Sequence, residues 1–203
     1  MKNYSLKPTE ENMLELLRTN PIQRNPYVFR FAEMLSHMED DCYSIALNGD
    51  WGSGKTFFVK QLKLLLDAAN PQSGMPKETR RLIEAQIQTA AWPESYVTVY
   101  YDAWSYDNHD DPILSLIYVT LQNGQGLDLS SNSGIRILNA ATAVFDAVTG
   151  KNLTALMNGL KGLCSEDKLS AIKKNEDLKE KIREFINLLI EEHGNRLVFF
   201  IDE

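Results

Sequence analysis

Eight consecutive residues, Gly49 to Thr56, read G-D-W-G-S-G-K-T and constrain the local fold more than any other part of the chain. Their three glycines allow backbone conformations that are closed to residues with a Cβ, so successive N–H groups can point to one side. The run from Tyr43 to Asn48 before them is typical of a short buried strand, and residues 57–66 after them have helical periodicity. We therefore expect a strand, a glycine-rich loop and a helix, in that order.

This pattern matches G-x-x-x-x-G-K-[ST], the phosphate-binding loop or Walker A motif, at every fixed position. The Lys55 ammonium is expected to reach the β- and γ-phosphates of a nucleotide, as a catalytic residue, and the Thr56 hydroxyl to bind Mg²⁺. The helix that starts here turns the positive end of its dipole toward the phosphates. A glycine-rich turn that carries Lys and Thr by chance is the competing interpretation, which the order of strand, loop and helix disfavours. The predicted nucleotide-binding residues are Gly49, Asp50, Trp51, Gly52, Ser53, Gly54, Lys55 and Thr56.

The rest of the chain alternates predicted helices with predicted strands. Tyr96 to Tyr101 and Leu197 to Ile201 are apolar, β-branched or aromatic runs, typical of strands buried on both faces. Helices are expected from Asn25 to about Met38, from Lys77 to Ala91, from Pro112 onward and from Asp177 to Glu192. This alternation predicts an α/β fold: a parallel sheet in a three-layer arrangement, with the phosphate loop at the carboxyl end of its strand.

The last predicted strand ends in Asp202 and Glu203. A carboxylate at the end of an apolar strand, the Walker B position, is the usual partner of a phosphate loop because it can hold Mg²⁺. Asp202 is thus a predicted metal ligand together with Thr56, and Glu203 is the predicted catalytic base that polarises the attacking water. The alternatives left open are an acid that ends the strand by chance and a solvated acid at position 203.

The composition narrows the class of protein. The chain has 203 residues, 43% of them hydrophobic, which suffices for one sizeable core, and one domain is the default. Its net charge of −7 argues against direct nucleic-acid binding, which needs clustered Lys and Arg. Two distant cysteines fit a reduced compartment, and no apolar run has the length of a membrane span or the form of a secretory signal. We expect a cytoplasmic protein.

Three segments of the chain resemble the KAP family of P-loop NTPases. They are the loop with Trp51 in its variable part, the run YDAWSYD from Tyr101 to Asp107, and the closing FIDE from Phe200 to Glu203. The resemblance implies an ATP-binding, Mg²⁺-dependent ATPase allied to the AAA and STAND groups, often tied to membrane-associated complexes or to exclusion of phage. It covers residues 25–203 as one P-loop domain, preceded by an N-terminal extension, residues 1–24.

Two departures from the family pattern matter. Members usually continue past the Walker B acids with Leu-Asp-Arg, whereas this sequence stops at Glu203. We therefore expect a domain truncated at the Walker B strand and inactive alone, because AAA-like folds insert a later strand between the loop strand and the Walker B strand. Many members also carry transmembrane helices between the two motifs. Here the corresponding stretch, in a helical insert at about 130–165, is expected to be water-soluble because polar residues interrupt it: Asp146, Lys151, Asn152 and Lys161.

The leading functional hypothesis is an ATP-hydrolysing switch in a larger assembly, whose nucleotide state changes its contacts with protein partners or with further copies of itself. The alternative is a nucleotide-binding scaffold with little turnover. A GTPase would need an Asn-Lys-x-Asp segment for base recognition. Residues 1–203 contain none, but such a segment would normally follow position 203, so this alternative stays open. No cluster identifies the acceptor site of a small-molecule kinase.

Overall fold

A computed structural model describes residues 7–20, 23–38, 42–86, 95–106, 111–123, 131–150, 170–194 and 196–202. Two strands, β1 (Tyr96–Asp102) and β2 (Arg196–Asp202), form a parallel sheet among these residues. The helices are α1 (Glu10–Thr19), α2 (Asn25–Ser36), α3 (Lys55–Ala69), α4 (Lys77–Glu84), α5 (Pro112–Asn123), α6 (Asn132–Thr149) and α8 (Ser170–His193). A 3-10 turn, η1 (Trp104–Tyr106), follows β1.

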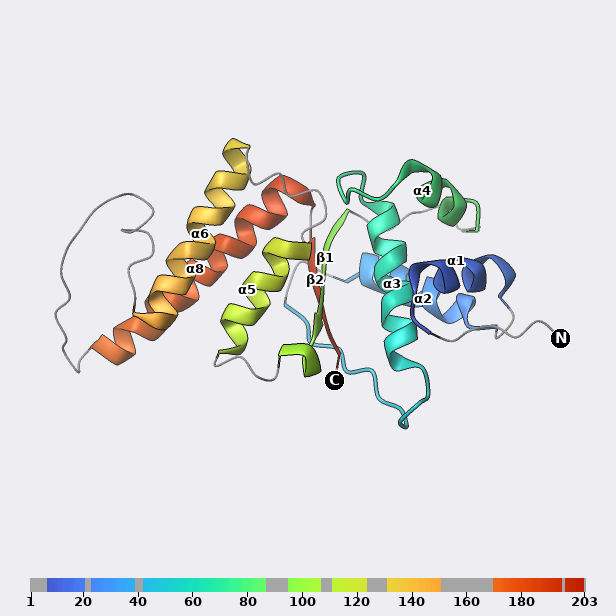
Figure 1. The fold of residues 1–203 in the computed structure, drawn as a ribbon, viewed down its shortest axis with the longest axis horizontal. Helices are drawn as coiled ribbons and strands as arrows, with labels where there is room; N and C mark the ends of the chain where they lie inside the picture. Colours follow the sequence, from blue (N-terminus) through green and yellow to red (C-terminus); the bar gives the residue numbers. More distant parts are fainter. Residues whose placement is uncertain are drawn as a thin grey trace.

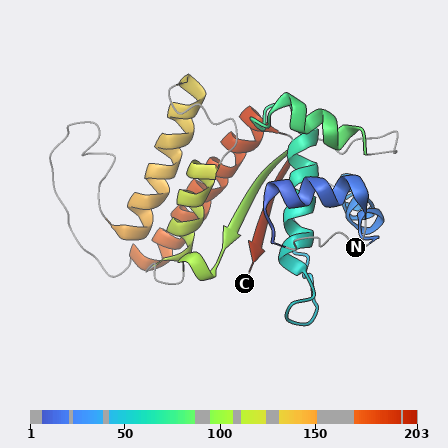
Figure 2. The same cartoon turned by 45° about the vertical axis from the view of Figure 1, so that its right-hand side comes forward.

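Helices lie on both sides of the two-stranded sheet (Figure 1). Helices α1 to α4 occupy one side, with α3 against both strands, and α5, α6 and α8 occupy the other. The view in Figure 2 shows that the amino end of α3 and the carboxyl ends of both strands face the same way. This is the layered α/β arrangement that the alternation of helices and strands predicts.

The two strands pair in register from Tyr96 with Arg196 to Asp102 with Asp202. Both faces of the sheet are covered, because alternate side chains of each strand enter different apolar clusters. Tyr96, Tyr100, Val198 and Phe200 pack with the α1 to α3 side, whereas Val99, Tyr101, Leu197 and Phe199 pack with Leu116 and Val119 of α5. The parallel register therefore brings the two strand ends, and their carboxylates, to one edge.

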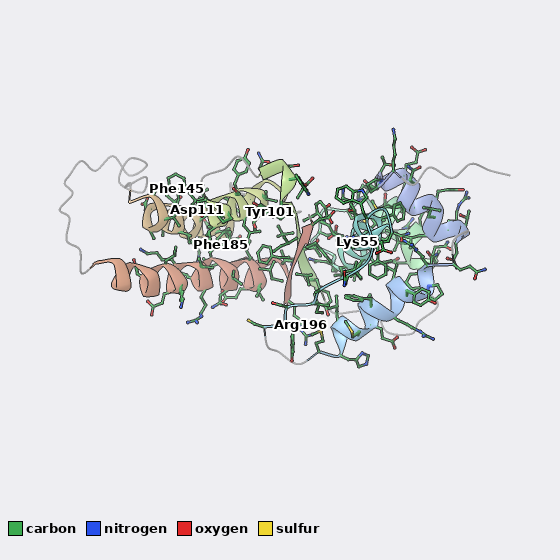
Figure 3. All side chains as sticks on the ribbon, turned by 90° about the horizontal axis from the view of Figure 1, so that it is seen from below. Lys55, Tyr101, Asp111, Phe145, Phe185 and Arg196 are labelled. Atoms are coloured by element: carbon green, nitrogen blue, oxygen red, sulfur yellow. The ribbon has the colours of Figure 1, made fainter. Side chains whose placement is uncertain are left out.

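Each helical layer has its own apolar core. Leu16 of α1, Val28 of α2 and Leu65 of α3 are buried in one cluster, so the predicted N-terminal extension packs directly against the helix of the phosphate loop. On the other side, Ile137 of α6 and Phe185 of α8 are buried in a second cluster. Figure 3 shows Lys55 and Phe185 on opposite sides of the strands.

Buried polar contacts join α3 to β1. The Asp67 carboxylate, 4% exposed, accepts hydrogen bonds from the Thr98 hydroxyl and from Lys63 Nζ, the latter at 2.6 Å. One turn further on, Asn70 Nδ2 donates to the Tyr96 carbonyl at 2.9 Å. Burying a carboxylate without hydrogen-bond donors would destabilise the fold. These contacts therefore fix how α3 lies along β1.

The prediction of a buried strand from Tyr43 to Asn48 is wrong. No strand forms there, and every residue from Cys42 to Trp51 is exposed. The physical reason is that a strand needs a neighbour to pair its N–H and C=O groups, and within the described residues β2 pairs only with β1. The predicted helix from Lys77 to Ala91 is described as α4 only to Glu84, and residues 87–94 lie outside the described part.

The predicted insert at about 130–165 contains α6, while positions 151–165 fall outside the described residues. Ser131 caps α6 because its hydroxyl oxygen accepts a hydrogen bond from the Gly134 N–H at 3.0 Å, and Gly150 ends the helix with φ 68°. Among the helices that the structure describes, none is both long enough and apolar enough to cross a bilayer.

We predict that Thr98→Val lowers the free energy of unfolding by about 1–3 kcal/mol, because it leaves the buried Asp67 carboxylate with one donor fewer. Urea unfolding measures the change. The matched control is Thr142→Val on α6, whose hydroxyl bonds only a carbonyl of its own helix at 2.7 Å and whose loss should cost under about 0.5 kcal/mol. Equal losses for the two variants would contradict the prediction.

Candidate functional site

The loop before α3 has the backbone conformation that its glycines predict. Gly52 has φ 76° and Gly54 has φ 87°, values that residues with a Cβ rarely adopt. The Ser53 N–H donates to the Asp50 carbonyl at 3.1 Å, which closes a tight turn inside the motif. Gly54 is the N-cap of α3, and no side chain caps this helix end. Loop and helix together therefore present backbone N–H donors and the positive end of a helix dipole, a suitable environment for an anion.

Lys55 brings a positive charge into this loop. It is the first residue of α3, and its Nζ donates to the Gly49 carbonyl at 2.7 Å and to the Asp50 carbonyl at 3.2 Å. Thr56 follows it in the first turn of the helix, half-buried. Trp51, at the tip of the loop, is 93% exposed. The Lys55 ammonium therefore lies against the backbone of the loop, whereas Trp51 lies in solvent.

Arg24, which lies outside the sequence motif, contacts the same loop. Its Nη2 donates to the Ser53 carbonyl at 2.8 Å, and a Cβ added to Gly54 would lie 2.5 Å from its Nη1. The guanidinium therefore packs directly on the backbone of the loop. Its position at the N-cap of α2 gave no sequence signal for this contact, because the two segments are brought together only by the fold.

At the strand ends, Tyr100 holds the carboxylate of Asp202. Its hydroxyl donates to Asp202 Oδ2 at 2.5 Å, from β1 to the neighbouring strand β2. Burial raises the pKa of Tyr100 far above its usual value, and the hydrogen bond to Asp202 and the negative charges of Asp202 and Asp102 raise it further. Asp102 is the register partner of Asp202 and accepts the Ser105 N–H at 3.2 Å.

Tyr100 also connects this edge to the helix of the phosphate loop. Lys60 on α3 places its Nζ 4.7 Å from the centroid of the Tyr100 ring, a cation–π contact. The loop helix and the Asp202 carboxylate are thus joined through one side chain. Glu203, the predicted general base, lies outside the described residues.

The chemistry of these groups fits a bound nucleotide with a divalent cation. Backbone N–H groups and the Lys55 ammonium suit phosphate oxygens, whereas the Thr56 hydroxyl and the Asp202 carboxylate are hard oxygen ligands of the kind that Mg²⁺ prefers. Both sets occur at the end of the layered fold where the strands finish and α3 begins (Figure 2). In open α/β sheets, ligands bind outside the carboxyl ends of the strands.

We predict a steeper alkaline loss of stability in the wild type than in Tyr100→Phe. Above about pH 10 a tyrosine ionises in the unfolded chain, whereas the raised pKa keeps Tyr100 protonated in the fold. The unfolded state then binds fewer protons, so the free energy of unfolding falls as pH rises. Urea unfolding across about pH 9 to 11 measures the slope, and Tyr27→Phe, the same substitution at an exposed tyrosine, is the matched control. Identical slopes in wild type and Tyr100→Phe would refute it.

Comparison with known proteins identifies the family of this chain. A family model described as the KAP family P-loop domain matches residues 24–203, and no curated protein or solved structure gives a match. The match includes the phosphate loop, both strands and Asp202, and it supports a P-loop fold that binds nucleotide, generally with Mg²⁺. It covers most of the 203 residues. The resemblance found in the sequence is therefore confirmed, and the chain belongs to the KAP family of P-loop domains.

Proposed function

We propose that this chain is an ATP-binding and ATP-hydrolysing domain that acts as a nucleotide-dependent switch in a larger assembly. The observation that carries the proposal is the loop from Gly49 to Thr56, with two glycines at positive φ and Lys55 Nζ inside the loop, at an uncapped helix start. Nucleotide binding follows from the family, and hydrolysis and switching are the additional steps proposed here.

In the proposal each residue has a defined role. Backbone N–H groups of residues 49–56 bind the phosphate chain, and Lys55 stabilises negative charge on the β- and γ-phosphates. Thr56 and Asp202 hold Mg²⁺, which when bound supplies positive charge at the phosphate oxygens. Glu203 accepts the proton of the attacking water as general base. Tyr100 keeps the Asp202 carboxylate oriented through its hydrogen bond at 2.5 Å.

The switch itself is supported by how the site is attached. Lys60 and Tyr100 link the loop helix to the strand end, and α1 and α2 pack on the same helix. A change in the bound phosphates can therefore move both the edge of the sheet and the surface formed by α1 and α2, where a partner could bind.

We propose one P-loop domain over residues 25–203 with residues 1–24 as an N-terminal extension, in a cytoplasmic setting. For phage exclusion or membrane-associated signalling, the family resemblance is the only support.

We predict that Lys55→Ala weakens Mg²⁺–ATP binding at least about tenfold, equivalent to about 1.4 kcal/mol, because the ammonium that neutralises the phosphates is removed. Titration with a fluorescent ATP analogue measures the affinity. Lys179→Ala, on the exposed surface of α8, is the matched control and should bind as the wild type does. Equal affinity of the wild type and Lys55→Ala would end the assignment of this loop to phosphate.

Glu203→Gln separates the switch from the scaffold alternative. If Glu203 is the general base, the variant keeps its ATP affinity but releases phosphate about a hundredfold more slowly, and it accumulates in the ATP-bound assembly. Phosphate release and size-exclusion profiles with ATP, both measured on the complete protein, report the two effects, with exposed Glu180→Gln as the control. Unchanged turnover and assembly in Glu203→Gln, or a wild type that binds ATP without hydrolysis in its assembled state, would favour the scaffold.

A further inference from the structure

Arg24 is far from the phosphate loop in sequence but touches its backbone in the fold. The guanidinium donates from Nη2 to the Ser53 carbonyl at 2.8 Å, and its Nη1 occupies the space that a Cβ on Gly54 would need. Because Gly54 is also the N-cap of α3, this contact falls on the peptide where the loop becomes helix. An arginine at this place both restrains the conformation of the loop and adds a positive charge beside it.

The contact between Arg24 and the Ser53 carbonyl also determines the direction of the Gly54 N–H. The Ser53–Gly54 peptide is trans, so its C=O and its N–H point to opposite sides of the chain. A donor that holds the Ser53 carbonyl therefore turns the Gly54 N–H away from Arg24. Backbone N–H groups in this part of a Walker A loop are the ones that donate hydrogen bonds to phosphate oxygens. Arg24 thus fixes the orientation of a donor that phosphate requires.

Polar contacts of the next residue fix the backbone beside Arg24. Its neighbour Asn25 is 6% exposed, and Asn25 Nδ2 donates to the Leu17 carbonyl of α1 at 2.6 Å. The Asn25 N–H donates to Asn20 Oδ1 at 3.2 Å, and Asn20 ends α1 in the left-handed region with φ 44°. The corner between α1 and α2 is therefore specified by side-chain bonds rather than by apolar packing alone. Because Arg24 is the N-cap of α2, this corner fixes the position of its Cα, from which the side chain extends to the loop.

We propose that Arg24 is a positioning residue for the phosphate site: by holding the Ser53 carbonyl, it aims the Gly54 N–H at the bound phosphate chain. The inference rests on the proposed function, because it takes a phosphate chain as the ligand. Since Arg24 acts through the loop backbone, it affects binding of the phosphate chain and not binding of the base or the ribose. It therefore applies equally to ATP and to inorganic triphosphate.

Binding measurements with both ligands test this assignment. In titrations with Mg²⁺–ATP and with Mg²⁺–triphosphate, Arg24→Ala should lose about tenfold in affinity for each, a change typical of losing one charge-assisted hydrogen bond. Arg24→Lys should be intermediate, because an ammonium can donate to one carbonyl but cannot also cover Gly54 as the planar guanidinium does. Arg18→Ala is the matched control on α1, where Arg18 pairs only with Glu15 on the surface, and it should bind as the wild type does.

A second measurement reports the peptide directly. With isotope-labelled glycine, the Gly54 amide resonance of the wild type should shift strongly when triphosphate is added, because that N–H becomes a phosphate donor. In Arg24→Ala the shift should be much smaller, while thermal unfolding without ligand matches that of Arg18→Ala. A residue that merely stabilised the fold would change the unfolding temperature and leave the Gly54 shift at full size.

The outcomes separate this inference from the function on which it rests. Wild-type affinity of Arg24→Ala for both ligands would overturn it, and so would a loss confined to ATP, which would place Arg24 at the base or ribose. If Arg24→Ala does not fold, Arg24→Lys decides, and wild-type affinity with an unchanged Gly54 shift in that variant would overturn the inference. Failure of the proposed function gives a different result, because Lys55→Ala would then bind triphosphate as well as the wild type does.

Discussion

The position of the phosphate loop depends on how α3 is fixed against β1. The Asp67 carboxylate is buried, and its bonds from Thr98 and Lys63 compensate for the loss of water. At the carboxyl end of the helix, Arg80 donates to the Ala68 and Asn70 carbonyls at 3.0 and 2.8 Å. These are carbonyls that a helix end leaves without helical partners. With one end fixed in this way, the other end of a rigid helix delivers the loop to the edge where the strands finish.

Parallel pairing makes the second half of the site. Two parallel strands end on the same side, so the pairing of Asp102 with Asp202 gathers carboxylates at one edge, and Tyr100 reaches across to the neighbouring strand. Its ring also receives Lys60 from α3. The fold thus connects residues of the loop helix and of the last strand through a side chain from a third element, between them in sequence.

Much of this could be predicted from local sequence, and the failures have a common physical cause. The glycine pattern and helical periodicity predicted the loop and α3, and the apolar run before Asp202 predicted β2, because each depends on neighbours in the chain. The strand predicted from Tyr43 to Asn48 failed because pairing requires a partner from elsewhere. The contacts of Arg24 with Ser53 and of Tyr100 with Asp202 span 29 and 102 residues, so no local pattern reports them. Long-range polar contacts of this kind follow from the assembled fold, and the roles of Asp202 and Glu203 stay predictions.

The two bonds from Lys55 Nζ to the Gly49 and Asp50 carbonyls bear on the energetics of the loop. Because the ammonium is already coordinated by its own loop, any anion that recruits it must compete with these carbonyls, and the two carbonyls must find other partners. The lysine then contributes a difference between two sets of hydrogen bonds and not the full strength of one. The same bonds keep the side chain folded inward, so less rotamer freedom is left to lose on binding. The Lys55 ammonium thus occupies the loop before any ligand binds, and an anion that binds there replaces the Gly49 and Asp50 carbonyls as its partner.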